Sequence, residues 1–150
     1  MSQRVGPEAG AVRFFSGDHR VCDELWAAVE TAAEGDDVTA VHTAFAAFDA
    51  ATRRHFDMEE QVLFPAVEAA TGTTMGPTAV MRGEHEQMRG LLMQMALVAA
   101  SDVGALLDQG DTLLMLIQQH NTKEEGMLYP MAEARLTGEW AGLAAKLARY

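Results

Sequence analysis

Apolar side chains recur along most of the chain at alternating spacings of three and four residues, which is the pattern of an amphipathic α-helix. Four such stripes follow one another, over residues 15–33, 41–66, 81–99 and 106–131. Each stripe contains a histidine, and the second and fourth stripes also contain a glutamate. The pattern predicts four helices whose inward faces are apolar apart from these few polar positions.

Turn-forming and helix-breaking residues separate the stripes. Residues 34–37 (Glu-Gly-Asp-Asp) follow the first stripe, and residues 71–78, which contain glycines and a proline, follow the second. We expect Ser16 to cap the first helix, and Pro65 and Pro130 to end or kink theirs. Because the connections are short, consecutive helices should be antiparallel neighbours. The sequence therefore predicts an all-α fold, an up-down-up-down four-helix bundle.

One twelve-residue phrase occurs twice. RHFDMEEQVLFP in the second stripe and QHNTKEEGMLYP in the fourth both contain His, three residues, Glu-Glu, two residues, Leu, an aromatic residue and Pro. The remaining histidines repeat as well, because His85 follows His19 by 66 residues. His120 follows His55 by 65 residues. The repeat predicts two similar helical hairpins, related by a pseudo-two-fold axis, with both histidine pairs turned inward.

Six ionisable side chains lie on the apolar stripes. A buried polar group is costly without a partner, and an unpaired carboxylate costs several kcal/mol. A single inward histidine is usually a hydrogen-bonded core residue, and His42 lies off the stripe, where we expect it to be solvated or at the core edge. Four inward histidines and two inward glutamates instead indicate a bound cation that satisfies them together. The predicted metal ligands are His19, His55, Glu59, His85, His120 and Glu124.

The spacing of the ligands indicates two ions. Residues i and i+4 lie on one helix face about 6 Å apart, so an imidazole can bind one ion while the carboxylate reaches between two. Six ligands exceed the four of a structural zinc, and imidazole with carboxylate suits iron or manganese. The ligand set predicts two ions, of iron or manganese and with zinc as a possible substitute, bridged by both glutamates and by an oxide or hydroxide. Each ion would keep a position for a small ligand.

Length, charge and composition narrow the function classes. The chain has 150 residues, 49% of them hydrophobic, so we expect one domain over residues 1–150, with its core at about 14–133 and a short fifth helix, 138–150, outside the bundle. The net charge of −11 argues against nucleic acid and membrane surfaces as partners. A single cysteine, no signal peptide and no membrane-length apolar run favour a cytoplasmic location. A homodimer is compatible with these properties.

The repeated twelve-residue sequence, together with the short sequences DHR at residues 18–20 and EH at residues 84–85, resembles the motifs of the hemerythrin-like (HHE cation-binding) family. The resemblance covers the chain from about residue 14 to about residue 131. It implies a four-helix bundle around a non-haem di-iron centre that handles dioxygen or related small molecules. Oxygen-carrying hemerythrins have a further histidine at the position of Arg89. The set of four histidines and two glutamates is closer to the di-iron domain of the iron-sulfur cluster repair proteins.

Residues beside the predicted ligands carry further predictions. Cys22 is interpreted as a small buried hydrophobe, with a thiol that reacts at the site as the alternative. Asp23 and Arg89 are interpreted as an ion pair beside the site, with Asp23 as a seventh ligand as the alternative. Glu60 and Glu125 are rotated by about 100° from the ligand stripe. We expect them at helix interfaces or as partners that orient histidine N–H groups.

The main functional prediction is a non-haem di-iron protein that binds O2, NO or H2O2, in oxidative or nitrosative stress response or in oxygen and iron handling. As an enzyme it would be an oxidoreductase that removes peroxide or nitric oxide. The alternative is an iron reservoir or donor, or an iron or oxygen sensor, including a role in iron-sulfur cluster repair. A metal-free structural bundle would leave six inward polar groups without partners.

Overall fold

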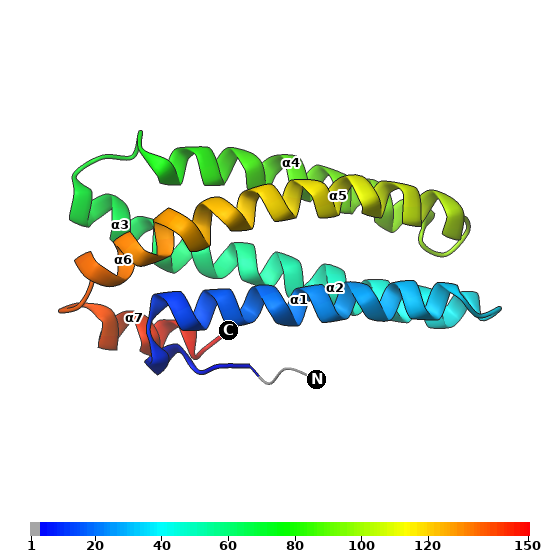
Figure 1. Ribbon diagram of the computed structural model, residues 1–150, viewed down its shortest axis with the longest axis horizontal. Helices are drawn as coiled ribbons and strands as arrows, with labels where there is room; N and C mark the ends of the chain where they lie inside the picture. Colours follow the sequence, from blue (N-terminus) through cyan, green and yellow to red (C-terminus); the bar gives the residue numbers. More distant parts are fainter. Residues whose placement is uncertain (1–3) are drawn as a thin grey trace.

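The computed structural model describes residues 4–150, so the first three residues of the expected 1–150 domain lie outside the described residues. Four long antiparallel helices form the predicted bundle (Figure 1), namely α1 (Ala11–Ala33), α2 (Val38–Met58), α4 (Pro77–Val98) and α5 (Val103–Lys123). The shorter elements are the 3-10 turn η1 (Pro7–Ala9), α3 (Phe64–Thr71), α6 (Tyr129–Arg135) and α7 (Trp140–Leu147). Residues 4–150 contain no strand, and the all-α prediction is confirmed. Within the same range, every helix is too short or too polar to cross a membrane.

Local chemistry sets the ends of the helices, with one correction to the sequence analysis. Asp37 and Asp102 cap α2 and α5 by accepting hydrogen bonds from backbone N–H groups of the first turn, at 2.9 and 3.0 Å. Gly72 ends α3 with φ of +74°, in the left-handed region that glycine adopts without steric cost. The predicted cap at Ser16 is wrong, because α1 already begins at Ala11 and Ser16 is buried inside the helix.

The two prolines of the repeated phrase do not end their helices. Instead α2 and α5 continue through five-residue π-helical turns, η2 (Glu59–Leu63) and η3 (Glu124–Leu128), into α3 and α6. Proline lacks an N–H and its ring clashes with the carbonyl four residues earlier, so the preceding turn widens to the i→i+5 pattern. The residue before each proline accordingly donates its N–H to the carbonyl of the glutamate five positions earlier. The repeated phrase therefore specifies a repeated π turn.

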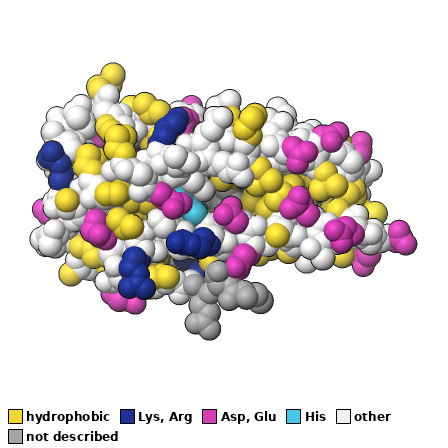
Figure 2. Space-filling view, in the orientation of Figure 1, with side chains coloured by type: hydrophobic (Ala, Val, Ile, Leu, Met, Phe, Trp, Pro, Cys, Tyr) yellow, Lys and Arg dark blue, Asp and Glu magenta, His cyan; other side chains and the backbone are white. Residues whose placement is uncertain are grey.

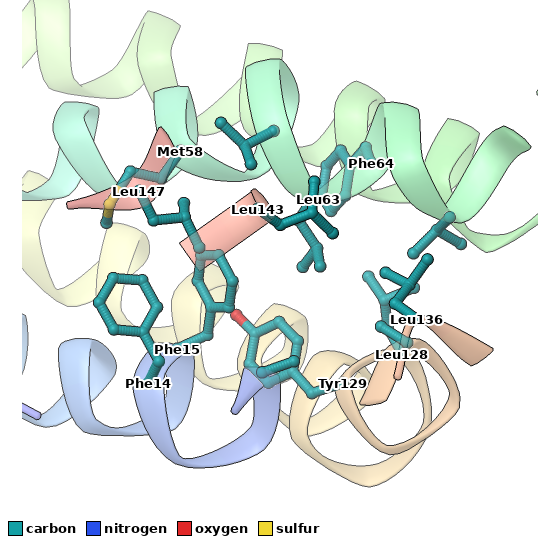
Figure 3. Close-up of a cluster of buried hydrophobic side chains, with 14 of the residues drawn as sticks. Phe14, Phe15, Met58, Leu63, Phe64, Leu128, Tyr129, Leu136, Leu143 and Leu147 are labelled. Carbon is teal, nitrogen blue, oxygen red and sulfur yellow. The ribbon is translucent and has the colours of Figure 1, made fainter. Parts of the chain in front are cut away.

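Two clusters of buried apolar side chains lie on opposite sides of the polar centre. One occupies the end near the α1–α2 and α4–α5 connections, and the other occupies the end covered by α3, α6 and α7 (Figure 3). The fifth helix, α7, is shorter than the predicted range 138–150. Its residues Leu143 and Leu147 belong to the second cluster, so the helix contributes to the core instead of packing outside it. Met127, which the fourth stripe placed in the core, is 51% exposed.

Candidate metal centre

All six predicted ligands meet in the middle of the bundle, and each is at most 5% exposed. Every long helix supplies one histidine, and each π turn begins with one of the glutamates. Their nitrogen and carboxylate oxygen atoms form two groups whose members lie within 4.8 Å of one another, namely Glu59, His85, His120 and Glu124, and His19, His55 and Glu124. The tertiary structure thus gathers residues from both halves of the repeat into one cluster.

Each glutamate contacts one histidine from each hairpin. Glu59 Oε1 lies 3.3 Å from His55 Nε2 and 3.2 Å from His85 Nε2. Glu124 is placed in the same way between the other two histidines, with an oxygen 3.1 Å from each Nε2. The cluster therefore contains a first-hairpin position and a second-hairpin position, both reached by both carboxylates. The histidines at these positions are His19 with His55, and His85 with His120.

A further carboxylate accepts a hydrogen bond from the Nδ1 atom of each of the four inward histidines. Because a carboxylate only accepts, each of these Nδ1 atoms carries a proton, and each Nε2 atom faces the cluster. The role predicted for Glu60 and Glu125 is confirmed, whereas the sequence analysis gave no role to Asp18 and Glu84. The sequence did contain a signal, because an acidic residue directly precedes the histidine in each half of the repeat, as Asp18-His19 and as Glu84-His85. The Nδ1–carboxylate distances are 2.7 Å for His19–Glu125, 2.8 Å for His55–Asp18, 2.7 Å for His85–Glu60 and 2.9 Å for His120–Glu84.

The predicted ion pair between Asp23 and Arg89 is wrong. Asp23 is exposed on α1 and belongs to neither group of ligand atoms. Arg89 instead donates to Asp57 at 2.8 Å and to Glu60 at 3.1 Å. Because Glu60 accepts from a histidine of the cluster, Arg89 supports that histidine from outside the centre. His42 is exposed on α2, as predicted.

Mutual attraction fixes the charges of the buried groups. Burial opposes the charge of His55, but Glu59 and Asp18 outweigh it and raise the pKa of His55 well above its usual value. Burial likewise opposes the charge of Glu59, but His55 and His85 hold the pKa of its carboxyl well below the usual range. The cluster therefore favours ionised carboxylates and attracts positive charge, whether as protons or as metal ions.

Protons alone satisfy this cluster poorly. One buried oxygen of each glutamate, Glu59 Oε1 and Glu124 Oε2, accepts no well-formed hydrogen bond, although histidine nitrogens lie close to it. The Nε2 atoms of His85 and His120 are 3.2 Å apart, where two N–H groups would point at one another. Metal cations at the two positions would use these lone pairs directly. The donor set suits iron, manganese or zinc, and not the all-oxygen preference of calcium and magnesium.

Tyr129 is a part of the centre that sequence reasoning missed. Its side chain is fully buried, and its hydroxyl lies 2.7 Å from Glu59 Oε2 and 2.9 Å from Glu124 Oε1. On a regular α-helix, the fifth residue after Glu124 would lie about 140° away from it. The π turn closes at the fifth residue and returns Tyr129 to the same side. The available signal was the aromatic position of the repeated phrase, which is Phe64 in the first copy and tyrosine in the second.

A small cavity lies against the first-hairpin position, on the side of Cys22. It has a volume of about 20 Å³, and its other walls are mostly the apolar side chains of Phe48, Phe56, Met88, Leu114 and Ile117. Burial raises the pKa of the Cys22 thiol, which keeps it neutral and supports its interpretation as a small hydrophobe. Thr52, also in the wall, is 3% exposed, and its hydroxyl lies beside the Cys22 thiol.

A wider surface groove overlies this cavity between α1 and α5. Its volume is about 690 Å³, and it shares Asp23, Leu114 and Asn121 with the cavity below. Figure 2 shows apolar side chains between acidic ones over the right half of the molecule, where α1 and α5 run in Figure 1. The shared residues show that only a thin wall of side chains separates the groove from the cavity beside His19 and His55.

The fold and the cluster together define a helical, cation-binding domain with buried histidine and glutamate side chains able to hold metal. Comparison with protein families matches residues 10–132 of the 150 to the hemerythrin HHE cation-binding domain. The chain belongs to this family. No match was found among curated proteins or among solved structures.

Proposed function

We propose that this protein is a non-haem di-iron protein that binds O2, NO or H2O2, in oxidative or nitrosative stress response or in oxygen and iron handling. The main support is the convergence of four Nε2 atoms on two carboxylates that each contact both hairpins, each of these histidines being held by a further carboxylate. When bound, two iron ions would supply redox-active centres with positions for a small ligand.

The proposed ligands divide between the two ions as the hairpins divide the chain. His19 and His55 would hold one ion and His85 and His120 the other, with Glu59 and Glu124 within reach of both. Asp18, Glu60, Glu84 and Glu125 hold the imidazole rings in a fixed orientation, because each accepts a hydrogen bond from Nδ1, and their negative charge strengthens the imidazoles as ligands. Fixing the rings in advance lowers the cost of ordering them when the ions bind.

The cavity supports a ligand of two or three heavy atoms. A cavity of about 20 Å³ exceeds the ~10–15 Å³ that one water molecule requires, but it leaves little room for anything much larger. Its apolar walls favour an uncharged molecule and disfavour bulk water. The hydroxyl of Thr52 in the cavity wall can donate a hydrogen bond to such a molecule.

Metal analysis of protein purified from iron-supplemented cells tests the proposal. We expect two irons per chain, and a change in absorption when NO is added to the reduced protein. His120→Ala should lose iron because it removes one of two imidazoles from an ion, whereas His42→Ala, at an exposed position of the same residue type, should keep both ions. Full iron retention in His120→Ala would show that the ligand assignment is wrong. Peroxide or NO consumption by the loaded protein would distinguish turnover from simple binding.

A further inference from the structure

The two proposed metal positions differ in one side chain. The hydroxyl oxygen of Tyr129 lies 3.1 Å from His19 Nε2 and 3.4 Å from His55 Nε2, in addition to its contacts with both bridging carboxylates. It therefore lies among the atoms that would hold the ion of the first hairpin. The pseudo-equivalent residue, Phe64, stacks on His85 with ring centroids 5.6 Å apart and offers no oxygen to the second hairpin.

The packing around Tyr129 keeps its oxygen in this place. The ring stacks on Phe15 at a centroid distance of 5.3 Å, and both side chains are fully buried. Figure 3 shows Tyr129 within the apolar cluster at this end of the bundle. The backbone N–H of Tyr129 is tied to the Glu124 carbonyl by the π turn. A side chain held at both its ring and its backbone has little freedom to withdraw when metal binds.

Hydrogen bonding alone accounts poorly for the position of this oxygen. A tyrosine hydroxyl carries one proton, yet two carboxylate oxygens and two imidazole nitrogens lie within 3.4 Å of it. One donated hydrogen bond satisfies one of the two carboxylate oxygens and leaves the other facing the lone pairs of the phenol oxygen. A cation placed among these five atoms would turn their mutual repulsion into shared coordination.

We propose that the phenolic oxygen of Tyr129 is a ligand of the metal ion held by His19 and His55. This inference rests on the proposed di-iron function. The ion of the first hairpin then has five protein ligands, and the ion of the second hairpin has four. When the oxygen binds the ion, the hydroxyl proton leaves to solvent, as protons do from other metal ligands.

The ligand cavity and Tyr129 approach the first-hairpin position from different places along α1. Tyr129 packs against Phe15, one turn before His19, whereas the cavity lies against Cys22, nearly one turn after His19. Tyr129 would therefore bind on the Phe15 side of this position and leave the Cys22 side to the small ligand. The two ions become chemically inequivalent, although the sequence gives each of them two histidines.

The visible absorption of the ferric protein tests this proposal, because tyrosine oxygen bound to ferric iron gives a charge-transfer band that imidazole and carboxylate do not give. The chain has two tyrosines, and the other, Tyr150, is exposed and donates a hydrogen bond to Gln61. We expect the iron-loaded protein to show the band, with tyrosine ring vibrations in the resonance Raman spectrum excited within it. Tyr129→Phe should abolish both signals and Tyr150→Phe should keep both.

Iron content and Mössbauer spectra make the result decisive. Two distinct iron environments are expected in the unmodified protein, and Tyr129→Phe should bring them closer together while keeping two irons. Phe64→Tyr, which places a hydroxyl at the equivalent position in the second hairpin, should add a second charge-transfer contribution. If the unmodified protein binds two irons but shows no tyrosine band, the ligand role of Tyr129 is wrong and the di-iron proposal stands. If it binds no iron, the proposed function itself fails.

Discussion

Replacing Asp18 with asparagine should weaken metal binding without changing any proposed ligand. Asp18 is 3% exposed, and its carboxylate accepts the Nδ1 proton of His55 at 2.8 Å. Asparagine has nearly the same size, and its carbonyl can still accept this hydrogen bond. The substitution therefore removes mainly the negative charge that makes the imidazole a stronger ligand.

The expected loss can be bounded from burial. Substitution of a carboxylate behind a metal-binding histidine lowers metal affinity by about 10–100-fold, or roughly 1.4–2.7 kcal/mol. The loss of metal affinity in Asp18→Asn should lie toward the upper end of this range because Asp18 is buried and water does not screen its charge. In addition, Arg4 and Arg54 lose their negative partner, so their positive charges would then repel the cation. Glu125→Gln should lie at or below the lower end, since the Glu125 side chain is 42% exposed although it contacts His19 at 2.7 Å.

Competition with a chelator, followed by the absorption of the iron-loaded protein, measures these affinities. Asp111→Asn is the matched control, because it makes the same chemical change at an exposed site on α5, away from the centre and its cavity. A thermal melt of each metal-free variant separates loss of affinity from loss of folding. Iron binding by Asp18→Asn as tight as that of Asp111→Asn would contradict this prediction, and so would weaker binding by Glu125→Gln than by Asp18→Asn.

Three other predictions concern stability and access. Removing the metal should lower the melting temperature by roughly 5–10 °C, because an ion present at 100 times its Kd stabilises the fold by about 2.7 kcal/mol; an unchanged calorimetric transition would contradict this. Gly110→Ala should destabilise the fold by about 1–3 kcal/mol in urea titration, since its Cβ would lie 2.2 Å from the Trp26 ring. Gly90→Ala, with nothing within 4 Å of the added Cβ, should stabilise it by about 0.5–1 kcal/mol. Leu114→Trp should slow NO binding in stopped-flow measurements, because the larger side chain would obstruct entry from the groove to the cavity. Met115→Trp is the control, since Met115 is 53% exposed and lines neither space. Equal binding rates for the two variants would indicate that NO enters by another route.

The sequence by itself specified the helices and which residues face the centre. Helical periodicity is a local property, so a stripe of apolar residues identifies the inward face without knowledge of the neighbouring helices. The same rule separated His42, which is exposed, from the inward histidines. It also placed Glu60 and Glu125 beside the ligand face, where both accept hydrogen bonds from histidines. The doubled phrase added that the two hairpins are alike.

Only the tertiary structure decided which side chains from different helices meet. Asp18 and His55 are 37 residues apart, and their hydrogen bond depends on how α1 packs on α2. Arg89 likewise donates hydrogen bonds to Asp57 on α2 and to Glu60 in η2, and not to Asp23, because the packing of α4 against α2 decides which side chains it reaches.

The π turns were decided by a balance that periodicity does not contain. Proline can end a helix or widen the turn before it, and packing of α3 and α6 against the rest of the bundle stabilises the second outcome here. This choice rotates Tyr129 by about 100°, somewhat more than a quarter of a turn, relative to an α-helix and brings its hydroxyl to both glutamates. A rule based on regular α-helical spacing placed that residue away from the centre, because the spacing itself changes at the site.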